Sequence, residues 1–206
     1  MSNRVIIEKQ KTGKTTYLMN EIDRMIKDGM NIIILDSATE HEDKSLLKKV
    51  VNKYSNAEEI FITDKNLIDI DNENIYEYIN HFSKHFPTEI LKNNKGKILC
   101  FDLSYFLERG HDIYDETNDI NLYKYYRRLY NNLAQQITLV TILAARYGII
   151  DNSIVVMDEI EFPIVDYDVS IFEENISFLA SVHPENAFGT FYENFEKIKF
   201  KVYRKD

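Results

Sequence analysis

Residues 11–16 combine one glycine, two lysines and three threonines, residue types that can surround a phosphate group. Backbone N–H groups of such a turn can wrap a phosphate, a lysine can reach the outer phosphates, and a threonine hydroxyl can hold Mg²⁺. An apolar run precedes this stretch and an amphipathic segment follows it, as a strand and a helix would. We therefore expect nucleotide phosphates to be bound by Lys11, Thr12, Gly13, Lys14, Thr15 and Thr16.

Glu8 departs from the complete pattern of a phosphate-binding loop, G-x-x-x-x-G-K-[ST], in which its position is a glycine. That first glycine mainly permits a tight turn, whereas the phosphate contacts come from the second half of the pattern. A carboxylate beside phosphates is unfavourable, so we expect the Glu8 side chain to point away from them. A lysine-rich surface turn that contains GKTT by coincidence is the alternative.

Asp158 and Glu159 form a second candidate for chemistry, directly after the apolar run 153–157. A carboxylate at the end of a buried strand can bind Mg²⁺, and the next one can orient or deprotonate an attacking water. We expect Asp158 to share the metal with Thr15, and Glu159 to act on the water. An ordinary strand that runs into an acidic turn is the alternative. The occurrence of both half-sites in one chain favours binding of ATP with Mg²⁺.

Apolar bursts alternate with amphipathic stretches along the chain, which predicts an α/β fold with a mainly parallel sheet. Several bursts are apolar throughout, as parallel strands covered on both faces are. Apolar residues three or four apart predict helices over Thr15–Asp28, ended by Gly29, and over Asp119–Tyr147. The expected strands cover residues 4–8, 31–36, 59–63, 97–102, 153–158 and 176–182.

Four other segments carry expectations of their own. The acid-rich residues 108–120 are expected to form a solvated, mobile loop, which beside a nucleotide site could be a lid. Basic and apolar residues alternate over 197–205, which predicts a last strand at a sheet edge. Cys100 lies inside an apolar strand and is expected to be unreactive. The aromatic set 123–132 could stack on nucleic-acid bases, although packing of an amphipathic helix explains it more simply.

The chain has 206 residues, a net charge of −9 and a single cysteine. This length suits one well-packed domain, residues 1–206. The negative charge argues against a whole surface devoted to nucleic acid, and one cysteine excludes an internal disulfide. The longest apolar run, 137–145, is too short to cross a bilayer. We therefore expect a cytoplasmic protein without membrane insertion.

The GKTT stretch and the Asp158–Glu159 pair resemble the RecA-like group of P-loop ATPases, the branch with an additional strand and a catalytic glutamate. NIIILDSATEHEDK (31–44) looks like the second strand of the HerA/FtsK superfamily. KILCFDLSYF (97–106) is similar to a strand of HerA-type and type IV secretion ATPases that ends in Asp-Leu-Ser. The resemblance implies a three-layer RecA-like fold that binds ATP and Mg²⁺ and hydrolyses ATP, with Lys14 and Glu159 as catalytic residues.

SVHPEN (181–186) is similar to a strand end that carries a histidine in type II and type IV secretion ATPases. By that resemblance His183, or alternatively Ser181, would sense the γ-phosphate. A turn histidine before Pro184 is the other interpretation of His183. Members of the group usually form rings, so the resemblance also implies a homo-oligomer. It implies a minimal motor-type or accessory ATPase of a mobile-element, phage or secretion-like system, acting with a protein partner or DNA.

Two functions from other classes compete with ATP hydrolysis. A small nucleotide or nucleoside kinase would need arginines that converge on the γ-phosphate, and a pocket for the acceptor. The adjacent carboxylates favour water as the acceptor but do not decide the question. The other competitor is an adaptor that binds nucleotide without hydrolysing it, a function that Glu8 in the loop would allow.

Overall fold

The computed structural model describes residues 3–7, 13–36, 45–61, 91, 96–146, 150–158, 160, 176–184 and 196–197. Its strands are β1 Arg4–Ile7, β2 Asn31–Asp36, β3 Ala57–Phe61, β4 Ile98–Asp102, β5 Ser153–Asp158, β6 Ile176–Val182 and β7 Glu196–Lys197. Its helices are α1 Lys14–Lys27, α2 Leu46–Lys53, α4 Ser104–Thr117 and α5 Ile120–Arg146. The expected alternation of strand and helix is therefore confirmed.

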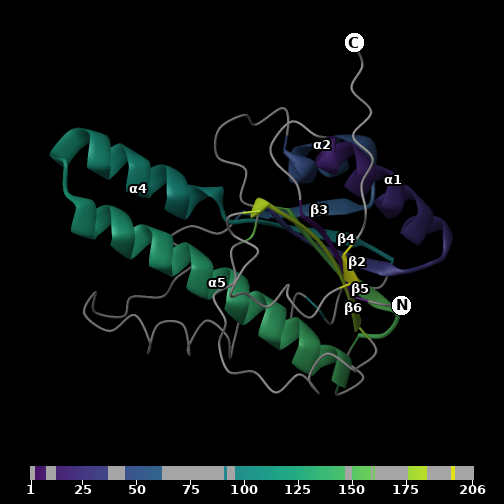
Figure 1. The fold of residues 1–206 in the computed structure, drawn as a ribbon. Helices are drawn as coiled ribbons and strands as arrows, with labels where there is room; N and C mark the ends of the chain where they lie inside the picture. The colour runs from purple at the N-terminus through teal and green to yellow at the C-terminus, as the bar shows by residue number, and fades with distance from the viewer. Residues whose placement is uncertain are drawn as a thin grey trace, which may run out of the picture.

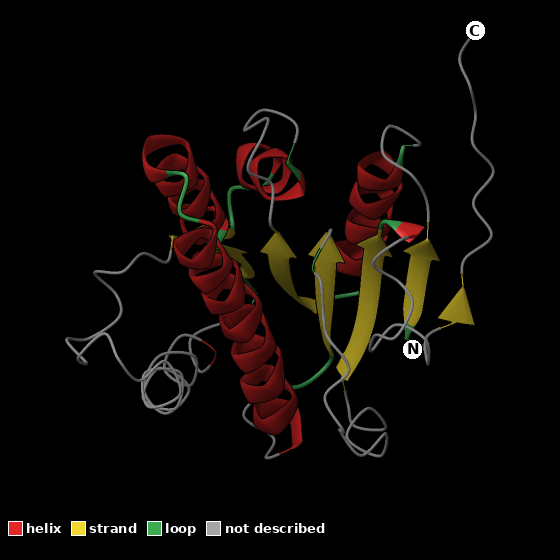
Figure 2. Cartoon of the chain, turned by 60° about the vertical axis from the view of Figure 1, so that its left-hand side comes forward, coloured by secondary structure: helices red, strands yellow, loops and turns green. Residues whose placement is uncertain are grey.

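The strands form one sheet in the order β3-β4-β2-β5-β6-β1-β7. Each neighbouring pair is parallel, and the strand arrows accordingly point the same way in Figure 2. The order of the strands in the sheet differs from their order in the sequence. Strands β5 and β6 lie between β1 and β2, although both come after β2 in the sequence. The described part is thus α/β with a parallel sheet, as predicted.

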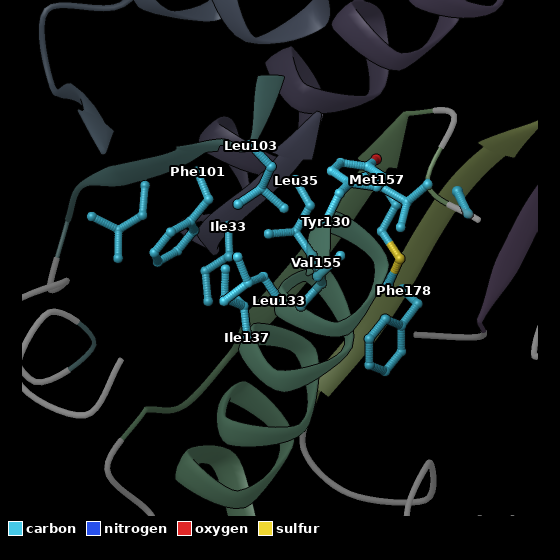
Figure 3. Packing of buried hydrophobic residues seen from close by; sticks show 14 of the residues in the cluster. Ile33, Leu35, Phe101, Leu103, Tyr130, Leu133, Ile137, Val155, Met157 and Phe178 are labelled. Atoms are coloured by element: carbon cyan, nitrogen blue, oxygen red, sulfur yellow. The ribbon is translucent and has the colours of Figure 1, made fainter. Parts of the chain in front are cut away.

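Helices cover both faces of this sheet (Figure 1). On one face, Ile32 and Ile34 of β2 pack in a core with residues of α1 and α2. On the other, Ile33 and Leu35 pack in a core with residues of α4 and α5, seen from close by in Figure 3. Successive side chains of a strand point to opposite faces, so a strand buried on both must be apolar throughout. The continuous apolar runs of the sequence have this physical cause.

Helix α1 has the start and the end that its sequence predicts, to within one residue. At its end, the Gly29 N–H donates to the Ile26 carbonyl at 3.1 Å and the Met30 N–H donates to the Met25 carbonyl at 3.0 Å. This is the paired bonding of a Schellman motif, and it requires the left-handed conformation that Gly29 adopts, with φ of 70°. The prediction that Gly29 ends the helix is confirmed.

Residues 108–117 are helical, so the expectation of a mobile loop there is wrong. They belong to α4, and only Asn118 and Asp119 separate α4 from α5. A Cβ atom on Gly110 would lie 3.1 Å from the Tyr126 Cβ, so the glycine lets the two helices approach closely. Packing against α5 therefore outweighs the weak helix propensity of the glycine and the aspartates.

Helix α5 begins one residue after its predicted start. The Asp119 side chain caps it by accepting from the backbone N–H groups of Asn121 at 2.9 Å and Leu122 at 3.1 Å. Leu133 and Ile137, near the middle of the helix, are fully buried. Tyr123 lies against aromatic rings of α4, so packing between helices explains that part of the aromatic set.

The segment that contains α2 and the edge strand β3 differs from the prediction in two respects. Strand β3 begins at Ala57, two residues earlier than predicted, and α2 was not predicted as a separate helix. Ser45 caps α2 by accepting from the Lys48 N–H at 3.0 Å. Of the predicted last strand, 197–205, the structure describes only its first residue, in β7 at the sheet edge.

Cys100 is fully buried in the middle of β4. Burial raises the pKa of its thiol to about 12, and the negative charges of Glu59 and Asp36 act in the same direction. At about pH 8 the reactive thiolate is therefore roughly one part in ten thousand. We expect an aromatic disulfide reagent to leave the folded protein unlabelled at this pH and to label it rapidly in concentrated guanidinium chloride. Fast labelling of the folded protein would contradict the buried position.

Candidate functional site

Four polar side chains stand side by side where the central strands end. Asp36 of β2 pairs in register with Asp102 of β4 on one side and with Asp158 of β5 on the other. Asp158 in turn pairs with Ser181 of β6, whose other neighbour is Ile6 of β1. All four side chains are at least nine-tenths buried. The parallel sheet thus gathers groups from distant parts of the sequence at one edge.

This polar row lies on the face of the sheet that α1 and α2 cover. Side chains two positions apart in a strand point to the same face. The residues two positions before the row pack in the core beside α1 and α2, and they are Ile34, Cys100, Val156 and Leu179. The row therefore faces the starts of the two helices, where backbone N–H groups lack partners within the helix.

The start of α1 has the backbone features of a phosphate-binding site. Gly13 precedes the helix with φ of 91°, a left-handed conformation that glycine adopts without strain. Glycine offers no side-chain acceptor to the N–H groups of the first turn, and that turn contains no acidic residue. These N–H groups and the helix dipole favour an anion in front of Lys14. The side chain of Lys14 is 6% exposed, and Thr16 is on the surface.

The structure brings Thr15 and Asp158 together, although 143 positions separate them in sequence. The Thr15 hydroxyl donates to Oδ2 of Asp158 across 3.5 Å, longer than the usual distance for such a bond. The hypothesis that these two side chains share one metal ion requires such proximity. Hydroxyl and carboxylate oxygens are also the ligand types that Mg²⁺ prefers.

The other carboxylate oxygen of Asp158 has a partner that the sequence did not predict. Ser181 is completely buried, and its hydroxyl donates to Oδ1 of Asp158. The sequence indicated Ser181 only as an alternative to His183 for contact with a phosphate. The in-register pairing of β5 and β6 decides its actual position, because it places the two side chains next to each other.

The remaining predicted site residues fall into two groups. His183 comes directly after β6 and is partly buried, next to Val182, which pairs with Ile7 at the end of β1. It thus lies at the same edge of the sheet as the other candidates. The residues outside the described part of the chain are Glu8, Lys11, Thr12 and Glu159.

Asp36 and Asp102 were not among the predicted site residues. Asp36 Oδ2 accepts from the Leu47 N–H of α2 at 2.8 Å, and Asp102 Oδ1 accepts from the Ser104 N–H of α4 at 2.9 Å. Each carboxylate therefore stabilises the start of the helix that follows its strand. The sequence did show that both strands end in aspartate. That pattern alone cannot tell an aspartate that caps a helix from one that binds a ligand.

A metal site built from several acidic, histidine or cysteine side chains is absent among the described residues, since no group of three or more could hold an ion. The predicted site needs fewer, because Mg²⁺ in phosphate sites uses one or two protein oxygens together with phosphate and water. Adjacent oxygens around octahedral Mg²⁺ are roughly 3 Å apart, and the oxygens of Thr15 and Asp158 lie close to that separation. These two side chains fit the ion.

Comparison with known proteins assigns no family to this chain. No protein-family model, no curated protein and no solved structure matches it. Among the described helices, none combines the length and the apolar character that crossing a membrane requires. The case for a function therefore rests on the residues of the site and on their arrangement.

Replacing Ser181 with alanine should lower the free energy of unfolding by about 1–3 kcal/mol, because a buried carboxylate oxygen loses its donor. Chemical denaturation of wild type, Ser181→Ala, Asp158→Ala and the double variant measures this effect. In the Asp158→Ala background the cost of Ser181→Ala should largely vanish, since the partner is already missing. Strict additivity of the two substitutions would show that the hydroxyl and the carboxylate do not interact.

Proposed function

We propose that this protein binds ATP with Mg²⁺ and hydrolyses it, as a RecA-like P-loop ATPase. The contact between Thr15 and Asp158 carries the proposal. It brings together the only two half-sites that the sequence singled out for nucleotide chemistry, one at the start of α1 and one at the end of β5. A lysine-rich surface turn or an ordinary acidic turn would give no reason for the two to meet.

The strand order gives further support. Strand β6 lies between β1, which leads to the phosphate-binding residues, and β5, which ends in Asp158. The RecA-like group is distinguished by an additional strand in its sheet, and β6 would be that strand. Helices on both faces are compatible with the three layers of this fold. The likeness to HerA/FtsK-type and secretion ATPases is a finer part of the same proposal.

Each side chain then has a defined task. The N–H groups around 11–16 and the ammonium group of Lys14 hold the phosphates, and Thr15 and Asp158 hold the ion. Mg²⁺, when bound, neutralises charge on the phosphate oxygens. Glu159 follows Asp158 directly and would accept a proton from the attacking water. His183 would contact the terminal phosphate from the end of β6.

The family resemblance also points to the work that hydrolysis would drive. We infer a motor-type or accessory ATPase of a mobile-element, phage or secretion-like system, located in the cytoplasm and acting as a homo-oligomer. A protein partner or DNA would be its substrate. This inference rests on the family resemblance alone.

Release of inorganic phosphate from ATP, with and without DNA, tests the function directly. Wild type should release phosphate only when Mg²⁺ is present, and Glu159→Gln should bind ATP but turn it over at least about 100-fold more slowly. Stimulation by DNA would favour a motor on nucleic acid. Transfer of phosphate to a nucleoside without free phosphate would identify a kinase. ATP binding without turnover, in wild type as in Glu159→Gln, would identify a nucleotide-gated adaptor.

A further inference from the structure

A topological switch point lies at one end of the polar row, between β2 with Asp36 and β4 with Asp102. These strands are neighbours, but the helices that follow them cover opposite faces of the sheet. Leu47 of α2 packs in the core beside α1, whereas Phe106 of α4 packs in the core beside α5. Helices α2 and α4 accordingly lie on different sides of the sheet in Figure 1. Where successive helices diverge in this way, a crevice opens beyond the carboxyl ends of the strands, and ligands of open α/β sheets bind there.

The structure contains a pocket of about 280 Å³ at this switch point. Five elements meet around it, since its lining comes from β2, β3 and β4 and from the first two turns of α2 and α4. None of the described residues proposed to bind ATP and Mg²⁺ lines it, and these are Gly13, Lys14, Thr15, Thr16 and Asp158. The lining residues that decide its chemistry are Asp36, Lys48, Glu59, Phe61, Asp102 and Glu108.

The charges on the pocket walls select a cation. Among the described lining residues, four side chains are carboxylates and one is a lysine, a balance of three formal negative charges. Lys48 is paired with Glu59, and its Nζ lies 3.8 Å from Oδ2 of Asp102. Asp36 and Asp102 are only 4% and 7% exposed. A cation that enters the pocket would meet carboxylates shielded from water, where charge attraction is strongest.

The aromatic side chain of Phe61 in the pocket lining favours a particular chemical class of cation. Phe61, at the end of β3, is 48% exposed although it is large and apolar. The ring of Phe61 contacts the ring of Tyr105 in α4 edge to face, with ring centroids 6.4 Å apart. This contact helps to hold the Phe61 ring in place. A planar guanidinium can stack on an aromatic face and also donate two parallel hydrogen bonds to a carboxylate. Exposed phenyl surface and carboxylates in one pocket suit this group.

We propose that the pocket between β2 and β4 binds a guanidinium group, either of a small compound or of an arginine side chain on a polypeptide. Its described lining residues differ from the described residues proposed to bind ATP. It would let a ligand or a partner be held next to the ATP site, since Asp36 lines the pocket and is also the in-register neighbour of Asp158.

Calorimetric titration at low salt with three probes tests the proposal. The probes are ethylguanidinium, a short blocked peptide with one arginine, and the same peptide with uncharged citrulline. We expect saturable binding of both guanidinium probes and none of the citrulline peptide. Tighter binding of the arginine peptide than of ethylguanidinium would identify a polypeptide as the source, and equal affinity a small compound. Absence of binding of both guanidinium probes, or equal binding of citrulline, would overturn the proposal.

Substitutions locate the binding in the pocket. Phe61→Ala should weaken binding about three-fold through loss of stacking, and Glu108→Gln by a similar factor through loss of charge. The matched control is Glu116→Gln, an exposed carboxylate of the same helix outside the pocket, which should bind as wild type does. Lys14→Met should also bind the probes normally, whatever its effect on ATP. Unchanged affinity in both pocket variants would overturn the assignment.

Discussion

Replacing Lys14 with methionine should reduce ATP turnover at least about 100-fold and weaken ATP binding, because an ammonium group aimed at developing phosphate charge is lost. Methionine has a similar length and is apolar, so it suits a side chain that is only 6% exposed. Folding should therefore be retained. Phosphate release and titration with a fluorescent ATP analogue measure the two effects separately.

The matched control for this experiment is Lys27→Met. Lys27 is an exposed lysine at the opposite end of the same helix, so its loss changes the net charge equally but leaves the phosphate site intact. It should turn ATP over as wild type does. If Lys14→Met were as active as Lys27→Met, the start of α1 would not be the phosphate site, and the proposed function would fail with it.

Replacing Asp158 with asparagine should make ATP binding far less dependent on Mg²⁺ and should lower turnover by about 100-fold. The substitution removes a charge but keeps the shape of the side chain and an oxygen that can accept from the Ser181 hydroxyl. The fold should survive, while the site loses its anionic ligand for the ion. Titration of ATP-analogue binding with Mg²⁺, compared with binding in a chelator, measures the change.

Asp151→Asn provides the control, because Asp151 is exposed just before the opposite end of the same strand. It should show the Mg²⁺ dependence of the wild type. A Mg²⁺ titration curve of Asp158→Asn that overlays the curve of Asp151→Asn would remove Asp158 from the metal site. ATP binding would then have to use other oxygens, and the contact between Thr15 and Asp158 would be only structural.

Much of the fold could be predicted because its signals are local. Residues 31–36, 153–158 and 176–182 are strands with the predicted bounds, since burial on both faces requires uninterrupted apolar side chains. The end of α1 was likewise marked by Gly29, whose backbone adopts the left-handed conformation. Each of these features depends on a residue and its near neighbours in sequence.

The features that the sequence predicted wrongly or did not predict depend on contacts between residues far apart in the chain. The acid-rich segment from Glu108 to Thr117 is a helix because Gly110 lets α4 approach Tyr126 of α5, which its own composition does not indicate. The pairing of Ser181 with Asp158 depends on which strands are neighbours in the sheet. Strand order is set by the connections and the packing of the whole chain, so no local pattern contains it.

The sequence by itself determined most of the strand segments, the helices α1 and α5, and the residues proposed for nucleotide chemistry, Lys14, Thr15 and Asp158 among them. Only the tertiary structure decided that Thr15 and Asp158 lie 3.5 Å apart, that Ser181 completes the surroundings of Asp158, and that a separate pocket opens between β2 and β4. The physical reason is that periodicity reports the environment of each residue, whereas a site requires the register and order of strands far apart in the chain.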